Sequence, residues 1–307
     1  MSIIVENLTK AYGPQKAVNN ISFEIKTGEV VGFLGPNGAG KSTTMKMICC
    51  YMTPTNGDVK LDQYSILSEP EEIKKRIGYL PENNPLYTDM PIIEYLRFTA
   101  EIQGMEKSRI SERIHEMVEL CGLDVEKHKK IGELSKGYRQ RVGLAQAMIH
   151  DPEVLILDEP TTGLDPNQII EIRKLIKKLG KEKTVLLSSH ILSEVEATCD
   201  RILIINKGRI VADGTSSTLR QQAQGQELLT VQIEAANGEV QKELLKLASV
   251  ATVEPVEDKD GFFRVQSKPD SSSRKPVFDL CVKKKWYLTE MTGIETRLED
   301  VFRELTN

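Results

Sequence analysis

The sequence lacks the features that mark several large classes of protein. Its five cysteines are odd in number and form no CxxC pair with zinc spacing: Cys49, Cys50, Cys121, Cys199 and Cys281. We therefore expect reduced thiols, as in the cytosol. No stretch approaches the ~18–20 apolar residues of a membrane helix. The start, MSIIVENLTK, has no basic region followed by an apolar core, so we expect no signal peptide.

An excess of positive charge is also missing. The chain has 41 Lys and Arg against 45 Asp and Glu, a net charge of -4. Because nucleic-acid binders usually carry a basic face, this balance argues against a nucleic-acid partner. The rest is ordinary globular composition, with 39% hydrophobic and 28% charged residues among 307. That length suffices for one large domain or two ordinary ones.

Short apolar segments alternate with helical patterns through the first part of the chain. EVVGFL at 29–34, VLILD at 154–158 and TVLLSS at 184–189 are strand-like and almost wholly apolar. Such strands indicate a parallel sheet that is covered on both faces. We predict an α/β domain over residues 1–220, with a helical subdomain at about 83–150.

The composition changes at QQAQGQ, and we predict a linker at 221–227. Residues 228–307 follow the order strand, helix, strand, strand, helix, strand, with one more helix at the end. This β-α-β-β-α-β order predicts a small ferredoxin-like α+β domain. Its last helix has an apolar face for which we favour packing on its own domain over a dimer contact: Leu298, Val301, Phe302 and Leu305.

A glycine-rich loop, GPNGAGKS, separates an apolar strand from a helix and fits the pattern G-x-x-x-x-G-K-[ST]. Glycines let backbone N–H groups converge on an anion, and the helix adds the positive end of its dipole. Lys41 can reach β- and γ-phosphates, and the Ser42 hydroxyl can ligate Mg²⁺. We predict a nucleotide-phosphate site made of Gly35, Pro36, Asn37, Gly38, Ala39, Gly40, Lys41, Ser42 and Thr43.

The strand at 154–158 ends in an acid, Asp158, and a second acid, Glu159, follows it directly. At the carboxyl end of a strand that neighbours the loop strand, Asp158 can hold Mg²⁺ through water. Glu159 is placed to polarise a water for in-line attack on the γ-phosphorus. Two adjacent acids alone would indicate a solvated turn, but the phosphate loop in the same chain favours chemistry.

Two further helix starts are predicted. Ser135, in LSKGYRQRV, can cap a helix that runs to about Ile149, and its serine and glycine form another potential anion site. On its own this is a weak signal, since many helices begin with serine. Asp165 and Pro166 suit the first positions of a helix that ends before Gly180.

Taken in their order along the chain, these motifs resemble those of the ATP-binding cassette (ABC) family over about residues 1–220. Residues 35–42 resemble the Walker A loop, and residues 154–158 the Walker B strand. LSKGY, with Ser135 and Gly137, is similar to the signature motif, and GLD, which ends at Asp165, to the D-loop.

Three single residues also match family positions. Glu159 matches the catalytic glutamate, and His190 matches the switch histidine that contacts the γ-phosphate. An arbitrary histidine would be a satisfied surface residue, but this one follows the strand TVLLSS. Tyr12, in LTKAYG, matches the aromatic residue that stacks on adenine.

The sequence departs from the family pattern at three positions. Lys136 and Tyr138 stand where the signature has glycine and glutamine. Glu82 stands where the family's Q-loop presents a glutamine. A carboxylate at Glu82 could still reach Mg²⁺ through water or face the attacking water.

The resemblance implies an ATPase that uses ATP and Mg²⁺ and forms a head-to-tail homo- or heterodimer with a second cassette. Because no membrane span is expected, it implies separate integral membrane subunits, which in relatives dock near residue 82 and on the helical subdomain. The tail resembles that of type-2 exporter ATPases, a group that includes gliding-motility, drug-resistance and sodium-export subunits. The implied location is cytoplasmic, peripheral on the cytoplasmic face of the inner membrane.

The sequence disfavours two other functions. A soluble non-transport cassette ATPase, of the translation or DNA-repair type, usually carries two cassettes, a long coiled-coil insertion or basic segments, and this chain shows none. A nucleotide-binding regulator without turnover is disfavoured by the presence of Glu159 and His190.

Overall fold

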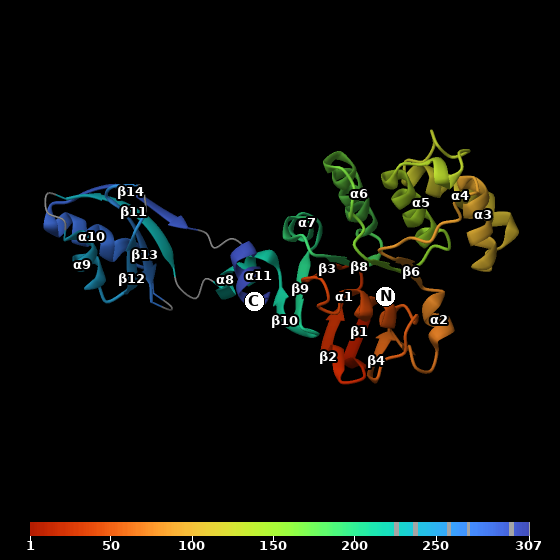
Figure 1. The fold of residues 1–307 in the computed structure, drawn as a ribbon, viewed down its shortest axis with the longest axis horizontal. Helices are drawn as coiled ribbons and strands as arrows, with labels where there is room; N and C mark the ends of the chain where they lie inside the picture. Colours follow the sequence, from red (N-terminus) through yellow and green to blue (C-terminus); the bar gives the residue numbers. More distant parts are fainter. Residues whose placement is uncertain (224–226, 236–238, 257–258, 269–270, 295–297, 307) are drawn as a thin grey trace. The chain divides into compact units, whose positions relative to one another are not determined.

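The computed structural model describes residues 1–223, 227–235, 239–256, 259–268, 271–294 and 298–306. The chain divides into two compact units, Met1–Thr215 and Ser216–Leu305 (Figure 1). Within the described residues, no helix is both long enough and apolar enough to cross a membrane.

A six-stranded sheet lies at the centre of the first unit, in the order β10-β9-β3-β8-β7-β6. Its strands are β3 (Val30–Leu34), β6 (Ile77–Leu80), β7 (Val154–Leu157), β8 (Thr184–Ser189), β9 (Arg201–Asn206) and β10 (Arg209–Gly214). All neighbouring pairs are parallel except β10 with β9. Every residue of β3, β7 and β8 is buried, which confirms the parallel sheet predicted from the apolar segments.

Both faces of this sheet are covered. On one face, Phe33 and Ile156 share a core with Met45 of α1 (Lys41–Ile48) and with an antiparallel sheet. That sheet has the order β2-β1-β4-β5 and comprises β1 (Ile3–Tyr12), β2 (Gln15–Ile25), β4 (Asn56–Leu61) and β5 (Tyr64–Ser65), with α2 (Pro70–Lys74) following. On the other face, α7 (Leu192–Thr198) approaches β3 so closely that a Cβ at Gly32 would overlap with Val195.

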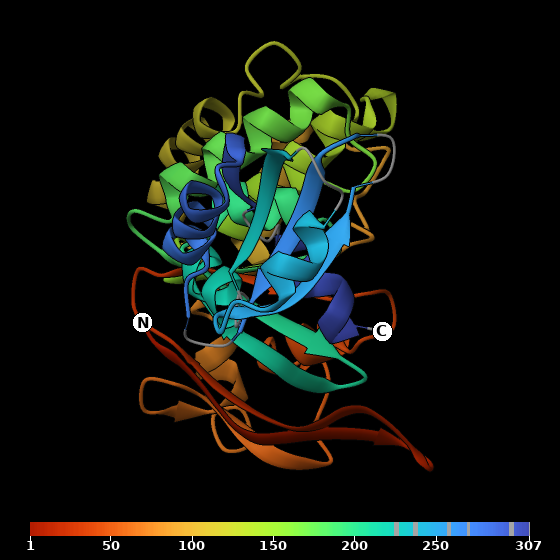
Figure 2. The same ribbon diagram turned by 90° about the vertical axis from the view of Figure 1, so that its left-hand side faces the viewer.

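A group of helices in the first unit lies at its opposite end from the antiparallel sheet (Figures 1 and 2). They are α3 (Ile92–Ile102), α4 (Lys107–Leu120), the short 3₁₀ helix η1 (Ile131–Glu133) and α5 (Lys136–Met148). These elements lie within the range 83–150 in which a helical subdomain was predicted. The helix α6 (Pro166–Leu179) connects β7 to β8.

One detail of the sheet corrects the sequence analysis. The strand that carries Asp158 was expected to neighbour the strand that leads into the glycine-rich loop. Instead, β8 pairs with both β3 and β7 and lies between them. Three wholly apolar strands do not reveal their order, because each can be buried on both faces in any central position.

The second unit begins with α8 (Ser216–Ala223), so residues 221–223, which were expected in a linker, end a helix; residues 224–226 lie outside the described residues. The next elements are β11 (Leu228–Glu234), α9 (Val240–Leu245), β12 (Val250–Pro255), β13 (Phe262–Ser267), α10 (Arg274–Lys284), β14 (Tyr287–Ile294) and α11 (Leu298–Thr306). The antiparallel sheet order β12-β13-β11-β14 confirms the predicted ferredoxin-like arrangement.

Val231, Val265 and Val277 belong to the core of this second sheet and its helices. The side chain of Val301 lies outside the described residues, so what the apolar face of α11 packs against stays a prediction.

Candidate nucleotide site

The glycine-rich loop joins the buried strand β3 to α1. Gly38 and Gly40 have φ angles of 78° and 110°, which glycine adopts without strain. A Cβ at Gly35 would overlap with the carbonyl oxygen of Ile205, so only glycine fits beside β9. The Nζ of Lys41 donates to the carbonyl oxygen of Gly35 at 2.8 Å, which holds the lysine across the loop.

The two acids predicted after β7 lie beside this loop. Asp158 is 1% exposed, and its Oδ1 accepts from the Ser42 hydroxyl at 3.1 Å and from the Ser188 hydroxyl at 2.6 Å. Ser188 therefore bridges from β8 across to the strand that carries Asp158. The side chains of Asp158 and Ser42 meet although the strand β8 separates β7 from β3.

Glu159 lies between the side chains of Lys41 and His190. Its Oε1 is 3.5 Å from the Nζ of Lys41, and its Oε2 is 2.9 Å from the Nδ1 of His190. The φ angle of Glu159 is 50°, an unusual conformation for a residue with a side chain, and its N–H donates to the Ser188 hydroxyl at 2.8 Å. Strained backbone of this kind gathers at functional sites, and here it aims a carboxylate at the phosphate loop.

A pocket of about 390 Å³ opens over these groups. Nine residues that were predicted to hold nucleotide or act on it line this pocket: Asn37, Gly38, Gly40, Lys41, Ser42, Thr43, Glu82, Glu159 and His190. Ala17 and Thr162 line it as well. Glu82 lines the same pocket as the loop, so a role next to Mg²⁺ or the attacking water stays a prediction.

Three contributors were missed from the sequence. Ser188 was only part of an apolar segment, although a serine near the end of a buried strand is a signal for a polar partner. Thr162 donates to Glu159 Oε2 at 3.3 Å, and Ala17 lines the pocket from β2. Neither of these two has a chemistry that would single it out without the fold.

Eight predicted residues do not line this pocket. Four of them belong to the loop and the end of β7: Gly35, Pro36, Ala39 and Asp158. The other four lie elsewhere on the first unit. Tyr12 is about half exposed at the end of β1, where its hydroxyl contacts the sulfur of Met52 at 3.1 Å. Ser135 caps α5 by accepting from the N–H of Tyr138, and Gly137 lies against Gln168. Asp165 caps α6, accepting from the N–H groups of Asn167 and Gln168 at 3.0 Å.

The signature-like segment and the D-loop-like segment nevertheless meet each other. A Cβ at Gly137 would overlap with the Gln168 side chain, and one at Gly163 would overlap with Lys136. Lys136, which replaces a glycine of the family pattern, therefore lies over the D-loop-like turn. The ring of Tyr138, which replaces a glutamine of the signature motif, lies 5.8 Å from the guanidinium of Arg141.

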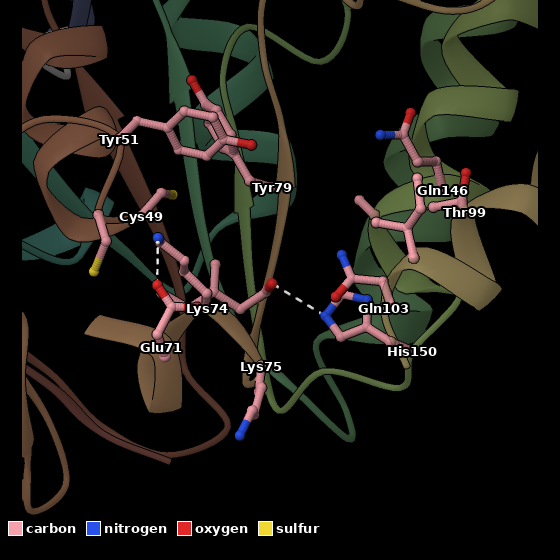
Figure 3. Close-up of a pocket in the computed structure, with 14 residues that line it drawn as sticks. Cys49, Tyr51, Glu71, Lys74, Lys75, Tyr79, Thr99, Gln103, Gln146 and His150 are labelled. Carbon is pink, nitrogen blue, oxygen red and sulfur yellow. Dashed lines mark hydrogen bonds and ion pairs between the residues drawn. The ribbon is translucent and has the colours of Figure 1, made fainter. Parts of the chain in front are cut away.

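A larger pocket of about 510 Å³ lies away from the phosphate loop, between the end of α1, α2, β6, α3 and α5 (Figure 3). Tyr51 and Tyr79 line one side of it, with their ring centroids 5.3 Å apart. Gln103 and His150 line the other, where a His150 ring nitrogen lies 3.1 Å from the carbonyl oxygen of Ile77. Burial raises the pKa of the Tyr79 hydroxyl and lowers that of the His150 imidazole.

Comparisons with known proteins give one consistent family. Residues 18–162 match the family model described as ABC transporter. The uncharacterised ABC transporter ATP-binding protein YxlF of Bacillus subtilis is 35% identical over 305 residues, 99% of each chain. The bacitracin transport ATP-binding protein BcrA of Bacillus licheniformis is 42% identical over 217 residues, 69% of this chain and 70% of that protein.

A solved structure is similar as well. It is a dimeric ATP-binding cassette, MJ0796, in a post-hydrolysis state with ADP and Pi, with a TM-score of 0.64 and 28% identity over 69% of this chain and 98% of that one. Similar proteins include ones named for bacitracin transport, linearmycin resistance and Nod factor export, which disfavours the alternative of a non-transport cassette ATPase. The chain belongs to the ABC transporter family, as an ATP-binding subunit that hydrolyses ATP.

Proposed function

We propose that this chain is the motor of an exporter, in which two cassettes close around two ATP molecules and drive transport through separate membrane subunits. The observation that carries the proposal is an incomplete site. Lys41, Glu159 and His190 meet at one pocket, whereas Ser135 and Gly137, on the same compact unit, do not line it.

The phosphate loop and α1 would bind the nucleotide's phosphates, and Mg²⁺ would bind next to them. The hydroxyl of Ser42 and the buried carboxylate of Asp158 are adjacent oxygen ligands of the kind that Mg²⁺ prefers, and Glu82 lines the same pocket. The ion would neutralise charge on the β- and γ-phosphates. Asp158 would reach it through water, and Tyr12 would stack on the adenine.

Glu159 would accept the proton of the attacking water. Its Oε2 lies within hydrogen-bond distance of His190, which would hold the carboxylate and contact the γ-phosphate. Lys41, 3.5 Å from the other carboxylate oxygen, would neutralise the γ-phosphate charge during transfer.

The second cassette would supply the remaining contacts. Ser135 at the start of α5 presents a helix N-terminus, where N–H groups and the helix dipole favour an anion. The similar MJ0796 cassette is a dimer with bound ADP and Pi, which supports the same assembly here. Asp165, at the start of α6, would lie at the dimer seam.

The larger pocket suits the membrane partner. It lies between the parallel sheet and the helices α3 and α5, and the exposed side chains of Tyr51 and Ile102 line it. Tyr79 lines this pocket while Glu82, three residues later, lines the nucleotide pocket. Docking there would place the chain on the cytoplasmic face of the inner membrane and couple the two pockets through this short segment.

The variant Glu159→Gln tests the proposal. It keeps the size of the side chain but removes the base, so we expect ATP binding to persist, turnover to fall by at least 100-fold, since a general base contributes about 10²–10⁴-fold, and an ATP-bound dimer to accumulate. Size-exclusion chromatography with light scattering, with and without MgATP, measures the dimer. A variant that stays monomeric with ATP while the wild type hydrolyses ATP normally would contradict the assignment.

A further inference from the structure

Glu194 of α7 is a buried carboxylate that no motif above includes. It is 4% exposed, although an unpaired charge is costly to bury. It stands four residues after His190 in the chain.

Three side chains from three segments converge on this carboxylate. Oε2 accepts from the Thr161 hydroxyl at 2.6 Å and from the Ser189 hydroxyl at 3.1 Å. Oε1 is 3.6 Å from a guanidinium nitrogen of Arg173 on α6. Two hydroxyl donors and a cation together offset the cost of burying the charge.

Two of these partners adjoin the reacting groups. Ser189 immediately precedes His190, and its hydroxyl also accepts from the N–H of Ile191 at 3.0 Å, so it holds the turn on both sides of the histidine. Thr161 follows Glu159 by two residues, in the turn after Glu159, whose φ angle is 50°.

We propose that Glu194 is a positioning residue for ATP hydrolysis: by joining Thr161 to Ser189 it fixes the distance between Glu159 and His190. The inference rests on the proposed function, because it requires both residues to act on the same phosphate. A one-ångström displacement of a positioned group can cost about 10²-fold in rate, so a linking carboxylate outside the pocket can control turnover without touching nucleotide.

The test is a double-mutant cycle on the full chain. Glu194→Gln keeps the shape but replaces one acceptor oxygen by a donor, and we expect kcat to fall by about tenfold or more with KM for ATP changed less than twofold. Thr161→Val and Ser189→Ala each remove one hydroxyl donor and should lower kcat in the same way. They serve as second variants in case Glu194→Gln folds poorly. Glu182→Gln, an exposed carboxylate after α6, is the matched control and should match the wild type.

Combining Glu194→Gln with His190→Ala distinguishes a positioning role of Glu194 from a purely structural one. If Glu194 acts through His190, adding Glu194→Gln to His190→Ala lowers kcat by less than twofold further. Independent multiplication of the two effects, or a fall in thermal stability with kcat unchanged, overturns the proposal. If His190→Ala alone leaves turnover intact, the proposed function of His190 fails, and this inference fails with it. Failure of Glu194→Gln alone leaves the proposed function standing.

Discussion

At the scale of single residues, the site depends on a few buried polar atoms whose partners come from distant segments. Ser188 accepts from the N–H of Glu159 and donates to Asp158, so one hydroxyl orients two acids. Lys41 is 7% exposed and lies between loop carbonyls and Glu159. Because a buried polar group without a partner is costly, these contacts favour a single arrangement of the side chains in the site.

His150 gives a residue-scale prediction on pH. Burial lowers the pKa of its imidazole below the ordinary value of 6.5, so the unfolded chain takes up a proton first as pH falls. The stability that His150 contributes as a neutral group is therefore present above pH 6.5 and is lost as pH falls below it. We expect the thermal midpoint of His150→Gln to fall less than that of the wild type between pH 7.5 and 5.5.

The matched control is His128→Gln, whose side chain is exposed. It should keep the wild-type pH dependence in the same scanning calorimetry series. Equal slopes for all three proteins would show that His150 does not titrate between the folded and unfolded states as described.

At the scale of elements, the glycine-rich loop, the caps of α5 and α6 and the ferredoxin-like order could be predicted because each leaves a local pattern. Asp165, predicted as a cap, also forms a reciprocal capping box with Gln168, which the sequence analysis did not predict. The order of strands could not be predicted, because β3, β7 and β8 are all apolar and their pairing depends on long-range packing. Ser188 was missed for the same reason, since its partner Asp158 became visible only when β8 was placed beside β7.

The cap of α6 gives an element-scale prediction. Asp165 Oδ1 accepts from two backbone N–H groups at the start of the helix. We expect Asp165→Ala to lower the free energy of unfolding by about 1 kcal/mol, and Asp165→Asn, whose amide oxygen can still accept, by less. Urea denaturation followed by circular dichroism measures the difference. An Asn variant as unstable as the Ala variant would argue against the cap.

At the scale of the whole molecule, the first unit contains one phosphate loop and one signature-like helix start, and the proposed site needs both from different chains. The segment from Tyr79 to Glu82 links the two pockets of this unit. Function is therefore expected to depend on what binds outside the chain at two places, the second cassette and the membrane subunit.

Glu82 gives a prediction at this scale. We expect Glu82→Ala to reduce the stimulation of ATP hydrolysis by the membrane partner more than the basal rate of the isolated chain. The comparison uses phosphate release by the purified chain and by the complex isolated from membranes. Glu112→Ala, on the exposed side of α4, is the control. Equal losses in both preparations would place Glu82 in catalysis alone.

The most direct measurement of the composite site is complementation between two inactive variants. Lys41→Ala disables the phosphate loop but leaves the signature-like helix, and Ser135→Arg does the reverse. Each variant alone should show at most about a tenth of wild-type ATPase activity, since each loses charge stabilisation of the phosphates. In a mixed dimer, the intact loop of one copy meets the intact Ser135 of the other, so we predict that mixing restores activity well above the sum of the two. A mixture no more active than that sum would contradict a site shared between two copies of this chain.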